Sequence, residues 1–237
     1  MVYNVIGPKR RMRNSNHVST RTFIQAVIFD YGNVLSCPQA SSDLNAMADR
    51  CGMPMERFHD LYWEFRPAYD RGELNGASFW TSVTVEVGKR PTPDEISELV
   101  SLDIQSWLHI DQATMTWAEQ LHRGGIRLAL LSNMPFEIAR YIENNCHWVF
   151  YFDPRIFSCD LGSVKPELSI YETCLARLNA LPDKVLFLDD RPENVAAAAQ
   201  LGMQALIFDD MKKVSGEVQR LFDLRLSPQI EVSATHK

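Results

Sequence analysis

The chain lacks the sequence features of a membrane protein or of a secreted protein. None of its apolar runs approaches the ~20 residues that a membrane-spanning helix needs, and its first residues lack the apolar segment of a signal peptide. Its five cysteines are odd in number and show no close metal-type pairing, which indicates reduced thiols rather than a disulfide framework. We therefore expect a cytoplasmic protein that makes no membrane contact.

Acidic residues are missing from the start of the chain, whereas the rest is acidic. Residues 1–21 carry five basic residues and no acid, which leaves 19 basic and 30 acidic residues elsewhere, a net charge of −11. An acidic body argues against nucleic acid as a partner, because phosphate backbones bind basic surfaces. We predict a disordered basic tail over 1–21, or alternatively a basic arm that touches anions, and a frayed tail over 226–237.

The body of the chain alternates short apolar runs with amphipathic segments. An unbroken apolar run is typical of a strand buried on both faces of a parallel sheet. Such runs predict strands at 26–29, 126–131, 156–159, 185–188 and 205–208. Helices are predicted at 111–123, 136–144, 167–178 and 193–201, with a loosely packed amphipathic stretch at 214–224. The alternation predicts an α/β fold, a Rossmann-like parallel sheet with helices on both faces, formed by residues 22–36 and 111–225.

Residues 37–110 interrupt this alternation with helical segments alone. These segments are predicted at 41–50, 54–69, 77–87 and 93–108. Thr92 and Glu95 form a capping box, with Pro93 at the first helical position. The segment 77–87 is the least typical helix, because β-branched residues are frequent in it. We predict an inserted, all-helical subdomain over 37–110.

Polar side chains follow three of the predicted strands, and a lysine-proline pair precedes a helix. In parallel sheets, ligands bind in the crevice beyond the carboxyl ends of the strands. A carboxylate at that edge could act as a nucleophile, a base or a metal ligand. Converging carboxylates repel one another unless a cation or a proton intervenes, and Mg²⁺ commonly joins carboxylates to a substrate phosphate. The residues concerned are Asp30, Ser132, Asn133, Lys165, Asp189 and Asp190.

In this order, the four segments resemble the four motifs of the haloacid dehalogenase-like hydrolase superfamily, which is mostly phosphatases. The resemblance covers residues 22–209 and implies that Asp30 attacks phosphorus and forms an aspartyl-phosphate, which water then hydrolyses. It implies that Lys165 contacts the phosphate and Asp30, and that the Ser132 hydroxyl and the Asn133 backbone N–H bind phosphoryl oxygens. It further implies that the helical insert is a cap that closes over the site and selects the substrate.

The same resemblance implies a set of metal ligands. The Mg²⁺ ion would be held by Asp30, the backbone carbonyl of Gly32 and Asp190. Asp189 would bind the ion directly or support another ligand.

Gly32 is the main departure from the family's pattern, which has a second aspartate at this position as general acid and then base. Acid–base help is typically worth ~10²–10⁴-fold, so either the rate is lower or the proton comes from elsewhere. The run Asp-Tyr-Gly-Asn-Val resembles a phosphatase branch that includes bacterial α-D-glucose-1-phosphate phosphatases, in which glycine occupies this position. Without a donor, sugar 1-phosphates should react faster than 6-phosphates; the opposite preference would point to an acid in the stretch 69–73.

We predict a Mg²⁺-dependent phosphatase of a small phosphorylated metabolite, such as a sugar phosphate. One alternative is a 2-haloacid dehalogenase that uses Asp30 without a metal, although that branch resembles Asp-x-Tyr-Gly-Thr and Tyr31 falls one position early. A second alternative, which Gly32 permits, is an inactive member that only binds a ligand or a partner. The stretch 66–73 could contact substrate or be a solvated helix end. The histidines show no ligand spacing and are assigned no role, and the sequence gives no signal for oligomeric state.

Overall fold

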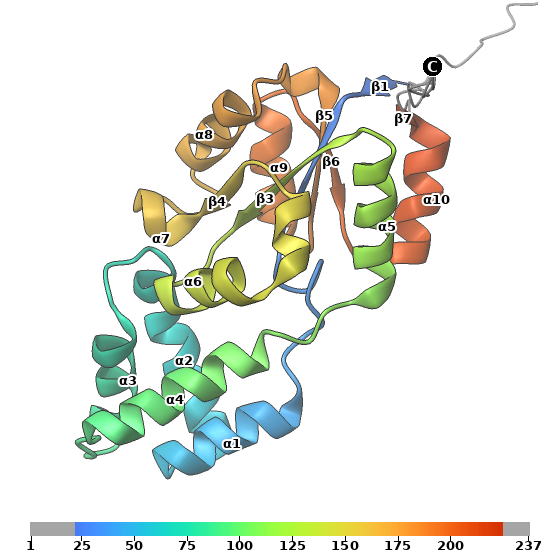
Figure 1. Cartoon of the computed structure of the whole chain (residues 1–237). Helices are drawn as coiled ribbons and strands as arrows, with labels where there is room; N and C mark the ends of the chain where they lie inside the picture. Colours follow the sequence, from blue (N-terminus) through green and yellow to red (C-terminus); the bar gives the residue numbers. More distant parts are fainter. Residues whose placement is uncertain (1–21, 225–237) are drawn as a thin grey trace, which may run out of the picture.

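The fold is built around a five-stranded parallel sheet, seen in a computed structural model that describes residues 22–224 (Figure 1). The strand order is β4-β3-β2-β5-β6. The predicted tails at 1–21 and 226–237 lie outside the described residues. The strands are β2 (Ala26–Phe29), β3 (Arg127–Ser132), β4 (Arg155–Phe157), β5 (Val185–Asp189) and β6 (Gln204–Ile207).

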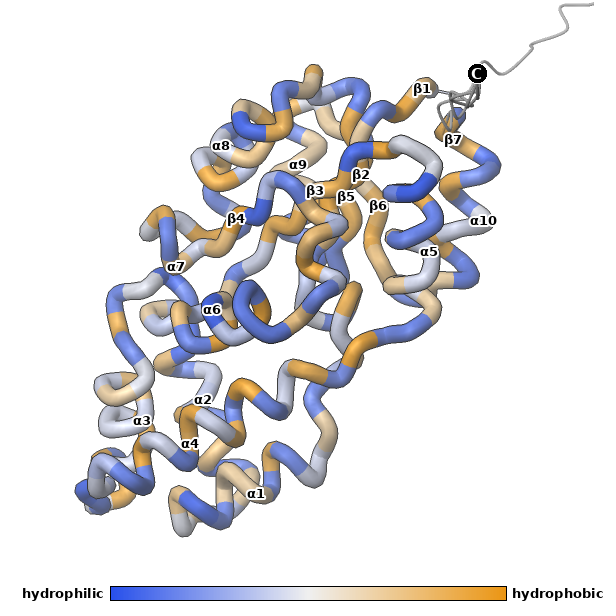
Figure 2. The backbone as a smooth tube through the Cα atoms, viewed as in Figure 1, coloured by the Kyte–Doolittle hydropathy of each residue, from blue (hydrophilic) through white to orange (hydrophobic). Residues whose placement is uncertain are grey.

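Helices cover both faces of the sheet because successive side chains of a strand point to opposite faces. Val27 and Phe29 of β2 pack in one core with α5 (Gln112–Arg123), α6 (Phe136–Asn145) and α10 (Met211–Leu221). Ala26 and Ile28 pack in the other with α8 (Leu168–Leu178) and α9 (Pro192–Gln200). Figure 2 shows apolar residues concentrated along the central strands. The predicted α/β fold is therefore confirmed.

The strand order reverses beside β2, which places a crevice at a defined point of the sheet. From β2 the chain moves outward through β3 to β4, and then returns to add β5 and β6 on the other side. Ligands of open α/β sheets bind at this reversal, beyond the carboxyl ends of the strands. Asp30 directly follows β2 and Asp189 is the last residue of β5, so both lie at the reversal point.

The helical insert has a core of its own. It contains α1 (Ser41–Cys51), α2 (Met55–Asp70), α3 (Gly76–Val85) and α4 (Pro93–Ser106), which lie together at one end of the molecule (Figure 1). The α3 helix forms despite its β-branched residues because Phe79, Trp80 and Val83 are buried in this core. The capping box at Thr92 is present as predicted.

Two local predictions were wrong. The predicted strand 156–159 ends at Phe157, and Ser158 begins the short helix α7 (Ser158–Leu161). The stretch 214–224 does not pack loosely. It contains most of α10, whose Val214 and Val218 are buried in the main core, and ends in β7 (Phe222–Leu224). β7 pairs in parallel with β1 (Thr22–Ile24) in a second small sheet, which joins segments about 200 residues apart.

In the described part of the chain, the remaining elements are two 3₁₀ helices, η1 (His147–Tyr151) and η2 (Pro182–Lys184). Within residues 22–224, no helix combines the length and the apolar character needed to cross a bilayer.

Replacing Thr92 by alanine should destabilise the protein through the loss of the α4 cap. The Thr92 hydroxyl accepts a hydrogen bond from the Glu95 backbone N–H at 3.3 Å, and Glu95 accepts one from the Thr92 N–H at 2.8 Å. Loss of such a cap costs about 1 kcal/mol, which urea unfolding can measure. Thr116→Ala is the matched control, because this exposed hydroxyl only donates to a carbonyl within α5. Equal effects of the two substitutions would contradict the expectation.

Candidate active site

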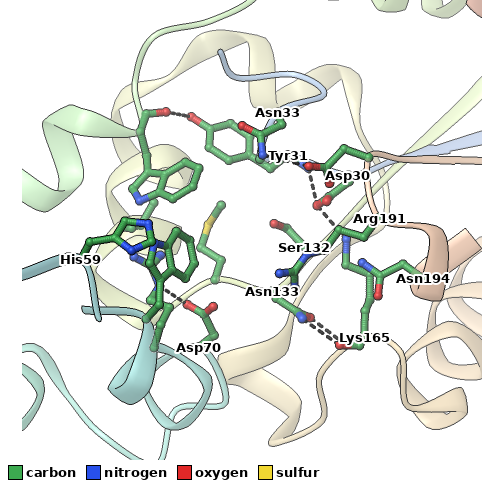
Figure 3. Close-up of a pocket in the computed structure, with 17 residues that line it drawn as sticks. Asp30, Tyr31, Asn33, His59, Asp70, Ser132, Asn133, Lys165, Arg191 and Asn194 are labelled. Atoms are coloured by element: carbon green, nitrogen blue, oxygen red, sulfur yellow. Dashed lines mark hydrogen bonds and ion pairs between the residues drawn. The ribbon is translucent and has the colours of Figure 1, made fainter. Parts of the chain in front are cut away.

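A cavity of about 450 Å³ lies at the carboxyl ends of the sheet strands. Its sheet side is formed by residues after β2, β3 and β5, and its opposite wall by α2 and the end of α4 (Figure 3). Six of the seven residues predicted for the site line it: Asp30, Gly32, Ser132, Asn133, Lys165 and Asp190. Asp189 is completely buried behind them.

The Lys165 ammonium lies between two carboxylates. Its Nζ is 2.7 Å from Oδ1 of Asp30 and 2.6 Å from Oδ2 of Asp189, and the side chain is buried. The Lys165 backbone is held by the Asn133 side chain, which donates to the Lys165 carbonyl at 3.0 Å and accepts from the Lys165 N–H at 2.7 Å. Sequence reasoning considered only the Asn133 backbone, whereas the structure shows that its side chain positions the lysine.

The two adjacent acids have different surroundings. Asp189 accepts hydrogen bonds from the Arg191 backbone N–H and the Asn194 amide, both at 2.9 Å, in addition to its contact with Lys165. Asp190 is half-buried and accepts one hydrogen bond, from the Asn33 amide at 2.9 Å. Among described residues its second oxygen has no hydrogen-bond donor, so Asp190 can offer that oxygen to a ligand.

In the loop after β2, the residue with a left-handed backbone conformation is not the glycine but the residue that follows it. Asn33 has φ = 58°, whereas Gly32 is outside the left-handed region. A Cβ on Gly32 would lie 3.4 Å from a ring carbon of Trp107, which is ordinary contact. The backbone conformation therefore does not require glycine at this position.

Crowded carboxylates make the site electrostatically unusual. Burial raises the pKa of Asp30 to about 7, and the charges of Asp189 and Asp190 add to this effect while Lys165 opposes it. Burial also raises the pKa of Asp190. Oxygens of the three acids lie within 4.8 Å of one another, and such a set suits a hard divalent cation. Because Asp189 already has three donors, Asp30 and Asp190 are the better candidates for its ligands.

The opposite wall contains residues that sequence reasoning missed. His59, assigned no role, and Trp63 line the cavity beside Arg66 and Asp70 of α2, which belong to the stretch 66–73 singled out in the sequence. Their spacing of four, three and four residues places them on one helix face, a signal that was present in the sequence. Trp107, which follows α4, also lines the cavity and was missed. The same holds for lining residues on the sheet side: Tyr31, Asn33, Met134, Ile138, Arg191 and Asn194.

The stretch 69–73, singled out in the sequence, contributes Asp70 alone to the cavity. The neighbouring Arg71 turns instead to the sheet side of the molecule, where its Nη2 lies 2.5 Å from Oε1 of Glu167.

Arg66 organises the charges of this wall. Its Nε donates to Oδ1 of Asp70 at 2.6 Å, and its Nη1 lies 3.4 Å from Oδ1 of Asp103. Tyr62 bonds both Arg66 and Asp103, and the guanidinium lies 5.4 Å from the ring centre of Trp107. The wall is therefore a fixed array of charges and aromatic rings.

Comparison with known proteins supports the same family. A family model described as haloacid dehalogenase-like hydrolase matches residues 24–202. Bifunctional epoxide hydrolase 2 of Rattus norvegicus is 36% identical over 76 residues, which are 32% of this chain and only 14% of that relative's length. The sesquiterpene phosphatase astK of Aspergillus oryzae is 24% identical over 201 residues, which cover 84% of this chain and 97% of the relative.

Among solved structures, an enzyme of the same family from Bacteroides thetaiotaomicron, in complex with magnesium and inorganic phosphate, has a similar fold. Its TM-score is 0.65 at 18% identity, and the match covers 81% of this chain and 98% of that one. At this identity the likeness shows the fold alone.

Asp30→Asn should stabilise the metal-free protein at neutral pH. Because folding raises the Asp30 pKa from 3.8 to about 7, the folded state favours the protonated acid. The stability that the raised pKa of Asp30 contributes to the folded state is fully present below pH ~4 and is lost as pH rises through ~7. The variant cannot ionise, so its advantage over wild type should grow across this window, by on the order of a few kcal/mol.

Urea unfolding in EDTA between pH 5 and pH 8 measures this difference. Asp183→Asn, at an exposed aspartate, controls for the loss of one negative charge. An advantage that does not change with pH would show that Asp30 is not under electrostatic strain.

Proposed function

Because the chain belongs to the haloacid dehalogenase-like hydrolase family, we propose that it is a Mg²⁺-dependent phosphatase that hydrolyses a small phosphomonoester through an aspartyl-phosphate. The observation that carries this proposal is the buried Asp30 carboxylate, in contact with Lys165 and beside the open oxygen of Asp190. A phosphorylated metabolite such as a sugar phosphate would enter through the cavity. Two comparisons support this class of reaction. The sesquiterpene phosphatase of Aspergillus oryzae is similar over 97% of its own length, and the similar structure from Bacteroides thetaiotaomicron is a complex with magnesium and inorganic phosphate.

In the proposed reaction, a carboxylate oxygen of Asp30 attacks phosphorus as the ester oxygen leaves. Lys165, the Ser132 hydroxyl and the Asn133 backbone N–H hold the phosphoryl oxygens. Ser132 is free for this task, because its hydroxyl makes no hydrogen bond with another described residue. Water then attacks the phosphorus of the aspartyl-phosphate and releases inorganic phosphate and Asp30.

The charge of the substrate has to be matched by cations. Lys165 supplies one, and it also lowers the pKa of Asp30 toward the ionised form that a nucleophile requires. Asp30, the Gly32 carbonyl and Asp190 would hold Mg²⁺, which when bound neutralises phosphoryl charge. Asp189 would keep Lys165 in place rather than bind the ion.

Helices α1 to α4, within residues 37–110, would act as a cap that selects the substrate. Within this range, α2 and Trp107 form the wall of the cavity that faces Asp30 (Figure 3). The leaving group would therefore contact α2 and Trp107, whereas the phosphate would contact the sheet side. The proposed localisation of the enzyme is the cytoplasm.

Asp30→Asn should abolish turnover of p-nitrophenyl phosphate in the presence of Mg²⁺. An amide cannot form the acyl-phosphate, so the rate should fall by at least ~10²-fold, while Asp183→Asn should retain the wild-type rate. Residual turnover above a few per cent would rule out the covalent route. Wild-type release of halide from 2-chloropropionate without metal would favour a dehalogenase, and failure with both substrates would favour a binding protein.

Asp190→Ala should raise the Mg²⁺ concentration required for half-maximal activity steeply. Asp189→Asn should raise it less and should instead lower the maximal rate, because Lys165 loses one of its two carboxylates. Titrating activity against Mg²⁺ for both variants compares the two acids directly. Equal shifts in the Mg²⁺ requirement would mean that both acids are ligands.

A further inference from the structure

Among the described residues, the sheet side of the cavity offers no acid that the proposed reaction leaves available to protonate the leaving oxygen. Gly32 has no side chain, and Lys165 already contacts two carboxylates. The Tyr31 hydroxyl donates to the Trp107 carbonyl at 2.6 Å, and burial raises its pKa far beyond the neutral range. Asp190 is reserved for the metal in the proposed reaction. A proton donor, if the enzyme uses one, has to come from the wall formed by the helical insert.

Asp70 has one fixed and one open carboxylate oxygen. Oδ1 accepts the hydrogen bond from Arg66 Nε at 2.6 Å. Oδ2 accepts none from a described residue and is not among the buried atoms without a partner, so it is reachable from the cavity that Asp70 lines. Figure 3 shows the carboxylate pointing into this cavity. The arrangement suits a proton-transfer group, which needs one anchored oxygen and one available oxygen.

The backbone of Asp70 is tied to the loop that would hold the phosphate. The Asp70 carbonyl accepts a hydrogen bond from Ser158 Oγ at 2.5 Å, and this hydroxyl accepts one from the Met134 N–H at 2.8 Å. Met134 directly follows Ser132 and Asn133. The completely buried Ser158 therefore fixes the distance between Asp70 and the phosphate loop.

Asp70 also lies on the side where the leaving group must be. In a phosphoryl transfer the attacking and leaving oxygens are roughly in line through phosphorus, so the leaving oxygen faces away from Asp30. Figure 3 shows Asp30 and Asp70 on opposite sides of the cavity, with Ser132 and Asn133 between them. The leaving oxygen of a bound ester would thus point toward the wall that carries Asp70.

We propose that Asp70 is the general acid and base of the reaction and replaces the function that Gly32 cannot provide. As the phosphorus–oxygen bond of the ester breaks, the Asp70 carboxylic acid transfers its proton to the departing alkoxide, which leaves as a neutral alcohol. The resulting Asp70 carboxylate takes a proton from water as the water oxygen attacks the aspartyl-phosphate. Asp70 returns to the acid form, so the proton balance closes over one turnover. This inference rests on the proposed phosphatase activity.

The surroundings of Asp70 favour the protonated form more than water does. Burial raises its pKa, as does the nearby Asp103, while Arg66 and Arg191 oppose the increase. His59, the other proton donor on this wall, is exposed, and no described residue hydrogen-bonds it; its ring lies 6.4 Å from that of Trp63. An imidazole without a fixed orientation is a poorer donor than a carboxyl held by Arg66.

The test is the dependence of rate on the leaving group. Wild type and Asp70→Asn are compared on p-nitrophenyl phosphate, phenyl phosphate, glucose 1-phosphate and glucose 6-phosphate with Mg²⁺. Esters of ordinary alcohols need the proton most, so Asp70→Asn should slow glucose 6-phosphate by ~10²–10⁴-fold and p-nitrophenyl phosphate by a much smaller factor. Asp60→Asn, at an exposed position of the same helix that does not line the cavity, should leave every rate unchanged.

Restoring an acid at the family's usual position provides an independent check. Gly32→Asp in the Asp70→Asn background should recover the alkyl esters selectively, because Gly32 tolerates a Cβ. Gly32→Ala in that background is the matched control and should recover nothing. Where loss of the Arg66 pair prevents Asp70→Asn from folding, Asp70→Glu keeps the charge but displaces the acid, and should show the same selectivity with a smaller loss.

The outcomes separate the inference from the proposed function. A uniform loss on all four esters, or no loss, would show that Asp70 is structural and would overturn the inference. A selective loss with His59→Gln instead would also overturn it. If wild type hydrolyses none of the esters, the phosphatase proposal itself fails, whatever Asp70 does.

Discussion

The buried ammonium of Lys165 is the interaction on which the rest of the site depends. It partly neutralises the charges of two carboxylates, those of Asp30 and Asp189, which lie at the ends of adjacent strands. Loss of the ammonium would leave both carboxylates without a cation and typically costs several kcal/mol, so the chain holds Lys165 and Asp189 from more than one side. The Asn133 side chain hydrogen-bonds the backbone of Lys165. Asp189 accepts hydrogen bonds from the Asn194 amide and the Arg191 N–H.

This arrangement does not balance the negative charge of the third acid, Asp190. One ammonium cannot offset three nearby carboxylates, so repulsion between the acids adds to burial, the main cause, in raising the pKa values of Asp30 and Asp190. A site that is strained without a cation binds one more readily, because ion binding relieves the repulsion. Charge imbalance in the crevice is therefore a cost to the fold, and in the proposed function it would favour binding of a divalent cation.

Several polar contacts join the helical insert to the sheet side, beside the apolar packing of Ile104, Trp107 and Leu108 against the main core. Tyr31 donates to the Trp107 carbonyl, and the Gly76 N–H donates to Glu137 at 2.5 Å. Arg71 binds Glu167, which follows Lys165 by two residues. Polar interfaces within a chain resemble those of transient complexes and permit relative motion. In the proposed function, such contacts would orient the insert over the cavity while allowing substrate to enter.

Much of this protein is determined by its sequence over short distances. The apolar runs before Asp30 and Asp189 specify buried parallel strands, and Thr92 with Glu95 specifies the start of α4, because these signals act within a few residues. The ordered polar residues at strand ends predicted the family, which the match over residues 24–202 supports. A parallel sheet then brings those residues together at its carboxyl edge as a matter of topology.

Other features depend on contacts between segments that are distant in the sequence, and only the tertiary structure determines them. The β1–β7 pair carries no local pattern of its own, and Ser158 turns helical where its hydroxyl meets Asp70 and Met134. The spacing of His59, Trp63, Arg66 and Asp70 marks one helix face, yet only packing against α4 and the sheet side shows that this face lines the cavity. Sequence spacing defines which side chains share a surface, whereas the burial free energy of the whole chain decides what that surface faces.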